Sequence, residues 1–365
     1  MHSEQEERAM SLWHGQLGAW KFQLTDYVVE VTPDVVARIE HYVNGTVLPA
    51  IAENNARIGG MPNWMLANFG VPSLLIRLDM PHLSGAEDVH IYECEQNVAG
   101  YGTTAVLEER AGSDRLVMTV ASSLADLGID KLMYGTLEYR RDQHEDLEHF
   151  MMLLQNYGIA IQPLASAPVS SSVPLWLRAG HEDYLGGGVL NQLHDRTLLW
   201  HLHSGGHKGY LVSISRAQYL SDILHLFHPY LNRPDEVSAS RVRECVQERF
   251  PTGVTIKPVG NWGCHGMRSW SPIAPYNRQE TMTRLLRMIQ EIVAGDVAED
   301  YLAQPYFPAE CIQRTGSKKP VFRMWRIYLA YFREGFRFAG GYFIERDTPI
   351  LHGASDAVFG QIVVV

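Results

Sequence analysis

A strand–helix–strand pattern in the middle of the chain constrains the fold more than any other feature of this sequence. An apolar run at 131–137, a helical pattern at 142–157 and a second apolar run at 159–163 follow one another, and Gly158 separates the helix from the second run. Two strands joined through a helix pair in parallel, because the helix carries the chain back across the sheet. The pattern therefore predicts a mostly parallel sheet in this region of a mixed α/β protein.

Other periodic segments predict elements on both sides of that unit. Thr32 is expected to cap a helix that begins at Pro33 and ends near Asn55. A Ser- and Pro-rich stretch at 165–174 is the best candidate for a linker. The remaining predictions are neighbouring strands at 73–79 and 89–97, helices at 238–248 and 278–293, a strand at 254–257, and strands over most of 301–365.

The charge of the chain argues against several classes of partner. Its 365 residues include 31 Lys and Arg against 41 Asp and Glu, and the formal net charge of −10 opposes a broad grip on nucleic acid or on an anionic membrane. No apolar stretch is long enough to span a membrane, and residues 1–10 lack the basic-then-apolar order of a signal peptide. We therefore expect a cytoplasmic protein with no nucleic-acid and no membrane partner, built from two or three lobes.

Cysteine and histidine form no familiar metal-binding pattern. The four cysteines lie far apart with no CxxC pair, so reduced thiols are expected. Four histidines lie between His194 and His207, and His201 and His203 would share a strand face, but no downstream His or Cys completes a zinc spacing. Packing or substrate contact is therefore favoured over zinc for this cluster.

Two predicted strands carry charged and polar side chains at alternating positions. Arg77 and Asp79 share one face of the first strand. Glu93, Glu95 and Asn97 share one face of the second. We expect Glu95 and Asn97 to converge on one cation, with Asp79 reaching across from its neighbouring strand. Oxygen ligands select Mg²⁺ or Mn²⁺ over zinc, and a solvated polar strand face is the alternative explanation.

A β-branched strand leads a lysine directly into a glycine-rich turn within 254–267. Glycines allow backbone N–H groups to approach phosphate oxygens closely, and the lysine ammonium supplies a point charge. The pattern thus predicts phosphate binding, and a glycine-rich hairpin with an exposed lysine is the alternative. The residues concerned are Lys257, Gly260, Trp262, Gly263 and Gly266.

Two further segments suit the same chemistry. The short run that ends in Gln304, Pro305 and Tyr306 is of a type that can hydrogen-bond an adenine edge through its backbone. Arg326 lies on a predicted strand, where its fork could bind phosphate oxygens or stabilise charge that develops in phosphoryl transfer. Pairing with surface Asp or Glu is the alternative for this arginine.

Taken together, these residues resemble the ATP-grasp ligases, and their order resembles a circularly permuted member similar to glutathionylspermidine synthetase. The family's Glu-x-Asn metal strand is matched by Glu95-Gln-Asn97, and its upstream Arg-x-Asp by Arg77-Leu-Asp79. In ordinary ATP-grasp enzymes the Glu-x-Asn strand comes last, whereas here it precedes the lysine loop. The resemblance covers residues 73–102 and 231–359.

The resemblance implies roles for the other motifs. Lys257 and the glycine-rich turn look like the strand and loop that cover the nucleotide phosphates, and 303–306 resembles the adenine hinge. The family's first ATP lysine is expected where this chain has Arg241 or Arg243. Lys208 is an alternative for that contact, and whether Glu93 is a metal ligand is left open.

The implied fold is α/β, an ATP-grasp-like fold in circularly permuted order that holds a nucleotide between two lobes, with a βαβ-type parallel-sheet subdomain beside it. Its expected segments are an amino-terminal helical substrate lobe at 1–72, metal-binding strands at 73–125, the βαβ domain at 126–230, and an ATP-binding lobe with the glycine-rich loop and carboxy-terminal strands at 231–365.

The implied activity is that of an ATP-dependent carboxylate–amine ligase, which forms an amide through an acylphosphate and releases ADP and phosphate. Its cofactors would be ATP and Mg²⁺ or Mn²⁺, and its partners a small-molecule carboxylate and a small-molecule amine, whose identities stay open. Arg77 and Arg326 would stabilise charge on the transferring group, and a homodimer is the commonest assembly for such a protein. The alternatives are a small-molecule kinase and a non-catalytic nucleotide-binding protein with a degenerate site.

Overall fold

The chain folds into two compact units. Unit 1 comprises residues 1–205 and 309–365, and unit 2 comprises residues 206–308. This division differs from the four segments predicted from the sequence, because strands of 309–365 pair with strands before residue 100 and so belong to unit 1. Among the described residues, no helix is both long and apolar enough to cross a membrane. The computed structural model describes residues 23–59, 63–81, 83, 89–96, 98–136, 141–164, 172–178, 194–199, 207–260, 267–272, 278–313, 320–348, 351 and 357–365.

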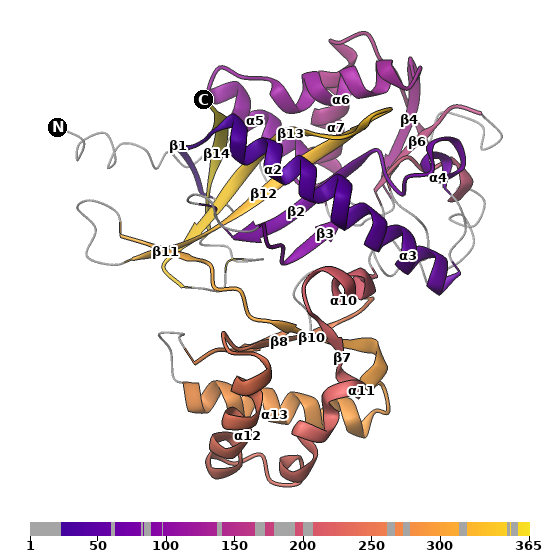
Figure 1. The fold of residues 1–365 in the computed structure, drawn as a ribbon. Helices are drawn as coiled ribbons and strands as arrows, with labels where there is room; N and C mark the ends of the chain where they lie inside the picture. Colours follow the sequence, from indigo (N-terminus) through magenta and orange to yellow (C-terminus); the bar gives the residue numbers. More distant parts are fainter. Residues whose placement is uncertain are drawn as a thin grey trace. The chain divides into compact units, whose positions relative to one another are not determined.

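A seven-stranded sheet forms the centre of unit 1. Its strands run in the order β1-β14-β13-β12-β2-β3, and β11 also pairs with β12. The β1–β14 pair is parallel, whereas the other pairs are antiparallel. Figure 1 shows the yellow to orange strands β12 and β13 beside the purple strands β2 and β3, which come from a distant part of the sequence. The bounds are β1 Gln23–Val31, β2 Leu75–Pro81, β3 Glu93–Glu95, β11 Glu310–Ile312, β12 Val321–Phe332, β13 Gly335–Arg346 and β14 Val358–Val364.

These strands confirm the neighbouring strands predicted at 73–79 and 89–97 and the strands predicted in 301–365. β12 and β13 are almost continuously buried, which is the pattern of strands covered on both faces. Any charged group that this part of the sheet carries must therefore be satisfied by partners inside the protein.

The helix predicted from Thr32 forms, but in two parts. Thr32 caps it by accepting a hydrogen bond from the Val35 N–H, and Gly59 ends the second part in the left-handed conformation. A π-helical turn lies between the two parts. The bounds are α2 Pro33–Tyr42, η1 Val43–Val47, α3 Leu48–Ile58 and α4 Trp64–Phe69.

Side chains of α2 and η1 cover a stretch of β13 that β14 does not reach. Glu40 Oε1 accepts a hydrogen bond from the Phe338 N–H at 2.7 Å. Asn44 exchanges two hydrogen bonds with the Phe336 backbone, at 2.8 and 2.9 Å. These side chains satisfy backbone groups that a neighbouring strand would otherwise have to satisfy, and so they close the edge of the sheet.

The parallel sheet predicted around 131–163 is confirmed. β4 pairs in parallel with β5 and with β6, in the order β5-β4-β6. The aromatic rings of Tyr101, Phe150 and Trp176 pack on one another with centroids 5.1–5.8 Å apart, and they join α5 to α7 and β6. The bounds are α5 Tyr101–Arg110, α6 Arg115–Asp126, β4 Lys131–Thr136, α7 Arg141–Gln155, β5 Ala160–Pro163, β6 Leu175–Arg178 and η3 His194–Arg196.

Unit 2 is a four-stranded antiparallel sheet with helices packed on one face. Its strand order is β7-β10-β8-β9. Ile256 and Ala303 belong to the apolar core that this face shares with α12 and α13. The helices predicted at 238–248 and 278–293 and the strand predicted at 254–257 are confirmed. The bounds are η4 Lys208–Tyr210, α10 Leu211–Ile214, β7 Gln218–Tyr219, α11 Leu220–Ile223, η5 Leu224–Leu226, η6 His228–Tyr230, α12 Glu236–Arg249, β8 Val254–Pro258, β9 Arg268–Trp270, α13 Arg278–Ala294, η7 Ala298–Asp300 and β10 Tyr301–Pro305.

Candidate functional site

Three carboxylates of unit 1 meet on the paired strands β2 and β3. The antiparallel register places Asp79 opposite Glu93, and Arg77 opposite Glu95. Oxygens of Asp79, Glu93 and Glu95 lie within 4.8 Å of one another, and Asp79 is buried while the two glutamates are half-buried. A cluster of carboxylate oxygens with no sulfur or imidazole ligand fits a hard cation such as Mg²⁺ or Mn²⁺.

Arg77 is bonded to two of these carboxylates. Its Nε lies 2.9 Å from Asp79 Oδ1, and its Nη2 lies 2.7 Å from Glu95 Oε1. Its Nη1 donates to the Ala99 carbonyl oxygen at 2.8 Å. Arg77 and Asp79 share a strand face because side chains alternate along a strand, and the register then brings Glu95 opposite the arginine.

Arg326 approaches the same cluster from β12. The register of β12 and β2 places Arg326 opposite Asp79, and Arg326 Nη2 lies 3.2 Å from Asp79 Oδ2. Its Nη1 donates to Tyr342 Oη at 2.9 Å. Its Nε is buried and has no hydrogen-bond partner among the described residues. Arg77 Nη2 also lies 3.5 Å from Asp79 Oδ2, so both arginines contact the same carboxylate.

Burial and charge act in opposite directions on these groups. Burial raises the pKa of Glu95 to about 7, although Arg77 acts to lower it. For Arg77, burial would lower the pKa, but Asp79 and Glu95 outweigh this and the pKa lies above its ordinary value. Burial and Arg77 would likewise lower the pKa of Arg326, and Asp79 reverses the effect. Both guanidinium groups are thus firmly cationic.

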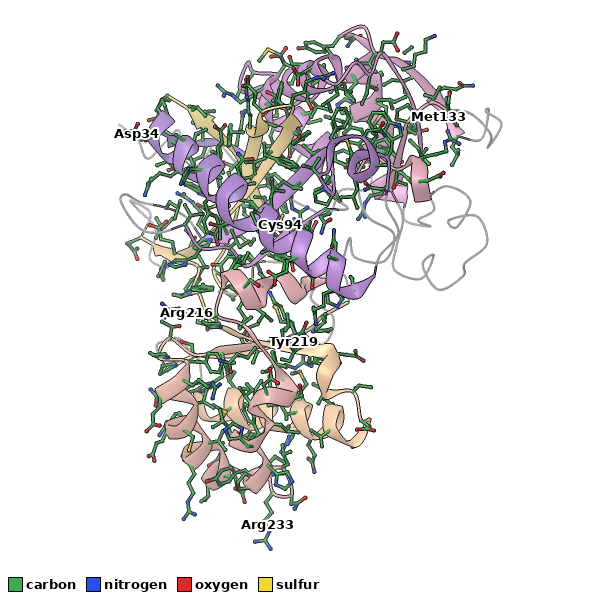
Figure 2. All side chains as sticks on the ribbon, turned by 45° about the vertical axis from the view of Figure 1, so that its right-hand side comes forward. Asp34, Cys94, Met133, Arg216, Tyr219 and Arg233 are labelled. Carbon is green, nitrogen blue, oxygen red and sulfur yellow. The ribbon has the colours of Figure 1, made fainter. Side chains whose placement is uncertain are left out.

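Cys94 lies on β3 between the two glutamates and is labelled in Figure 2. Because side chains alternate along a strand, the thiol faces away from the carboxylate cluster. Burial, followed by the charges of Glu95 and Glu93, raises its pKa well above the ordinary value. A thiol that stays protonated at neutral pH is a poor nucleophile and a poor metal ligand, so this cysteine is a packing residue.

The backbone at Ala99 and Gly100 joins the cluster to α7, the helix between β4 and β5, and this link was not predicted from the sequence. Tyr328 Oη donates to the same Ala99 carbonyl oxygen as Arg77, at 2.7 Å. Asp146 accepts hydrogen bonds from the Gly100 N–H at 3.1 Å and from the Thr103 N–H at 2.9 Å, at the start of α5. The local sequence did offer one sign of this link, the glycine just before α5. Gly100 has a φ of +83°, a backbone conformation that favours glycine. Nothing near Asp146 in the sequence identifies its partner.

In unit 2 the structure places Lys257 on the sheet face that lies opposite the helices. Lys257 pairs with Leu302, and Thr255 pairs with Gln304. Ile256 and Ala303 face the helical core, so Lys257 and Gln304 share the other face. Both are buried, with exposed fractions of 6% and 3%.

The predicted hinge forms the end of β10. β7 pairs with Leu302 and Ala303 only, whereas β10 continues along β8 to Pro305. Tyr219, the residue of β7 that pairs with Leu302, is labelled in Figure 2. On the β7 side, no described strand pairs with β10 beyond Ala303. The Tyr306 N–H donates to the Gly253 carbonyl oxygen at 2.8 Å. On the β7 side, the backbone of Gln304 and Pro305 therefore pairs with no described strand.

Among the candidates for the contact of the first ATP lysine, Lys208 lies beside the segment that carries Lys257. The Lys208 N–H donates to the Val259 carbonyl oxygen at 2.8 Å, and Lys208 is buried. Arg241 lies on an exposed position of α12, whose buried face includes Val242. The structure thus brings Lys208 and Lys257 to neighbouring segments and places Arg241 on the helix layer.

Several candidates fall outside the described residues, namely Asn97, Trp262, Gly263, Gly266, His201 and His203. Gly260 is the last described residue before the glycine-rich turn, and a Cβ atom there would meet nothing within 4 Å. His207 Nδ1 accepts a hydrogen bond from the Gly209 N–H at 3.2 Å and so caps η4. His194 lies in η3.

No protein-family model matches the chain, and no curated protein sequence matches it. Among solved structures, the D-cycloserine synthetase DcsG matches with 11% identity over 58% of this chain and 90% of its own length, at a TM-score of 0.29. The biotin carboxylase domain of the Hydrogenobacter thermophilus 2-oxoglutarate carboxylase, solved with MgADP, ADP and bicarbonate, matches with 9% identity over 62% of this chain and 61% of its own length, at a TM-score of 0.22.

Proposed function

We propose that this protein is an ATP-dependent carboxylate–amine ligase. The observation that carries the proposal is the cluster of Asp79, Glu93 and Glu95 with Arg77 and Arg326 bonded to it. Such a cluster offers oxygen ligands for Mg²⁺ beside two fixed guanidinium groups, which is what phosphoryl transfer to a carboxylate requires. The resemblance of the same motifs to permuted ATP-grasp ligases supports the assignment.

The order of the elements also supports the permuted arrangement. β2 and β3 precede unit 2 in the chain, whereas β12 and β13, which complete their sheet, follow it. A metal strand that comes before the nucleotide-binding segment is the order that the resemblance implies.

The proposal assigns metal and acyl-transfer roles to unit 1. Asp79 and Glu95, together with Asn97 and Glu93, would hold Mg²⁺, which supplies charge neutralisation to the phosphoryl oxygens. Arg77 and Arg326 would stabilise negative charge on the transferring group and on the acylphosphate. These arginines are suited to the role because their side chains are buried and already fixed by several partners.

Nucleotide roles fall to unit 2. Lys257 would contact phosphate oxygens, with Lys208 as the second lysine in place of Arg241. The backbone at Gln304, Pro305 and Tyr306 would bind adenine. The glycine-rich turn, with Gly260, Trp262, Gly263 and Gly266, would cover the phosphates and exclude water while the acylphosphate waits for the amine.

The reaction balances with no protein nucleophile. A substrate carboxylate oxygen attacks the γ-phosphorus of ATP, the bond to the β–γ bridging oxygen breaks, and ADP leaves. The amine nitrogen then attacks the acyl carbon of the acylphosphate. The carbon–oxygen bond to phosphate breaks, phosphate leaves with the electron pair, and the nitrogen loses a proton to give the amide.

The test is ADP and phosphate release from ATP and Mg²⁺ with pooled amino acids, other carboxylates and polyamines, followed by mass spectrometry. A ligase sustains ADP release over many turnovers only when both a carboxylate and an amine are present, because the amine consumes the acylphosphate. Its product has their summed mass less water. Asp79→Asn and Lys257→Met should each abolish release, while Arg337→Gln, on an exposed side chain of β13, should leave it unchanged.

A small-molecule kinase is the second candidate, because the same carboxylates and arginines would serve phosphoryl transfer to a hydroxyl or carboxylate that is then released. ADP formation that needs no amine, with a phosphorylated product, would favour the kinase. ATP binding without turnover in every pool would leave a nucleotide-binding protein and overturn the ligase.

A further inference from the structure

The candidate metal ligands of unit 1 are already bonded to arginines. Arg77 Nε lies 2.9 Å from Asp79 Oδ1, and Arg326 Nη2 lies 3.2 Å from Asp79 Oδ2, so each oxygen of this carboxylate faces a guanidinium group. Arg77 Nη2 also lies 2.7 Å from Glu95 Oε1. A divalent cation at this cluster would use the same oxygens. The arginines and the cation are therefore competitors.

The charge of the cluster favours the arginines over a divalent cation that binds alone. Three carboxylates face two guanidinium groups, so the cluster carries one excess negative charge when all five are ionised. A divalent cation alone would turn this into an excess positive charge. The Arg77 and Asp79 side chains are each 3% exposed and the Arg326 side chain 10% exposed, so solvent screens such an excess poorly.

We infer that this cluster binds a divalent cation together with an anion, which takes the arginine N–H groups and so releases the carboxylate oxygens to the cation. The inference rests on the proposed function, because it takes the Asp79 cluster as the metal site. Arg326 suits the anion, since its Nε is buried and has no hydrogen-bond partner among the described residues. Tyr342 Oη holds the other end of the same guanidinium group at 2.9 Å.

The consequence is that metal affinity depends on the anion. Without an anion, the ion pairs keep the carboxylates occupied and the cation binds weakly. With an anion, the affinity for the cation rises by the coupling factor, and by linkage the cation raises the affinity for the anion by the same factor. Couplings between two ligands of one protein are typically about 5- to 150-fold.

The first experiment uses the wild-type protein and needs no variant. Mn²⁺ binding is titrated by electron paramagnetic resonance with and without inorganic phosphate, and a protein-free titration corrects for the complex that phosphate forms with Mn²⁺ in solution. We expect phosphate to tighten Mn²⁺ binding by about 5-fold or more. Equal Mn²⁺ affinity with and without phosphate would overturn the inference.

The second experiment distinguishes an arginine that competes with the cation from a merely structural one, because the two predict opposite changes in Mn²⁺ affinity. Arg326→Gln removes a competitor for Asp79 Oδ2 and one positive charge, so Mn²⁺ should bind several-fold more tightly without phosphate, and the effect of phosphate should shrink. If Arg326 only supports the fold around Asp79, the substitution would weaken Mn²⁺ binding under both conditions, and the inference would fail. Arg337→Gln is the control, because Arg337 is exposed and pairs with Glu334.

These results separate the inference from the proposed function. Coupled binding of Mn²⁺ and phosphate without ATP turnover would remove the ligase and leave the coupling in place. Turnover of ATP with a carboxylate and an amine, by a protein that binds Mn²⁺ equally well without phosphate, would support the ligase and remove the coupling.

Discussion

The two sheets that carry the candidate residues hold their charged groups in different ways. In unit 1, β12 is buried along most of its length, and Arg77, Asp79 and Arg326 satisfy one another inside the protein. In unit 2, one face of the sheet forms the apolar core with the helices, and Lys257 lies on the other face. The charged groups of this network in unit 1 thus compensate one another inside the protein, whereas the described core of unit 2 is apolar.

Charge is also divided unequally between the units. The acidic excess of the chain lies entirely in unit 1, because the Lys and Arg of unit 2 outnumber its Asp and Glu by one, 11 against 10. The net charge of −10 therefore says little about unit 2, where a bound phosphate would face no large repelling field. An overall charge excludes broad electrostatic surfaces but not a local anion site.

The largest effect should come from breaking the buried network of unit 1. Asp79→Asn keeps the shape of the side chain but leaves Arg77 and Arg326 with less compensating charge in a buried site. We expect the free energy of unfolding to fall by about 3–5 kcal/mol, as measured by urea denaturation. A loss below about 1 kcal/mol would show that the two arginines find other partners and that the comparison with unit 2 fails.

A second prediction concerns Glu108, whose carboxyl is buried against Gly340 and accepts a hydrogen bond from the Leu116 N–H. Burial raises its pKa to about 8. The folded state therefore holds a proton that the unfolded state has lost between about pH 4.5 and pH 8. Stability should fall as the pH rises through this window, by up to about 1.4 kcal/mol per pH unit.

Glu108→Gln should remove this contribution. The variant should match the wild type near pH 4.5 and exceed its stability at pH 8, as measured by urea denaturation across the range. Asp146, whose pKa burial raises to about 6, adds a slope of the same sign at lower pH in both proteins. If the free energies of unfolding of the two proteins changed in parallel with pH, Glu108 would not be the cause of the fall in stability toward pH 8.

A third prediction tests backbone packing in unit 2. Gly253 has a φ of +109°, and a Cβ atom there would lie 2.2 Å from the Trp270 carbonyl oxygen, so Gly253→Ala must shift β8 against β9. We expect unit 2 to lose about 1–3 kcal/mol. Gly260→Ala is the matched control for stability, because its Cβ atom would meet nothing within 4 Å. Equal losses for the two variants would mean that the contact with Trp270 does not matter.

The smallest effect should come from an exposed ion pair in the same sheet as Asp79. Arg337 and Glu334 have side chains that are 53% and 82% exposed, and the arginine also lies over the Phe332 ring. Arg337→Gln should change the free energy of unfolding by less than about 1 kcal/mol. If Arg337→Gln lowered the free energy of unfolding as much as Asp79→Asn, burial would not explain the difference in strength between the two ion pairs.

Local patterns predicted the elements, because each depends on neighbours in sequence. The strand–helix–strand order gave the parallel sheet, and alternation along a strand placed Arg77 and Asp79 on one face. The continuous helix expected after Thr32 is interrupted by a π-helical turn, from which Asn44 reaches the Phe336 backbone. No local pattern could signal that contact.

Long-range register escaped prediction for the same reason. Arg326 meets Asp79 across 247 residues, and Tyr342 joins them from a third strand. A shift of one residue between β12 and β2 would turn Arg326 to the other face, and the packing of the whole sheet fixes that register. Arg326 could thus be predicted as a strand arginine, but not as the partner of Asp79.

The insertion of unit 2 between the two parts of unit 1 has a consequence for how the chain acquires its structure. During synthesis, β2 and β3 emerge long before β12 and β13, and residues 206–308 intervene. The edge of β2 therefore stays unpaired until β12 is made, and the contact between Arg326 and Asp79 closes a loop of more than 200 residues. Contacts between residues so far apart in sequence make folding slow. Unit 2, whose described strands all lie between residues 218 and 305, can fold during that interval. The nascent chain thus meets its slowest step last, when the sheet of unit 1 closes.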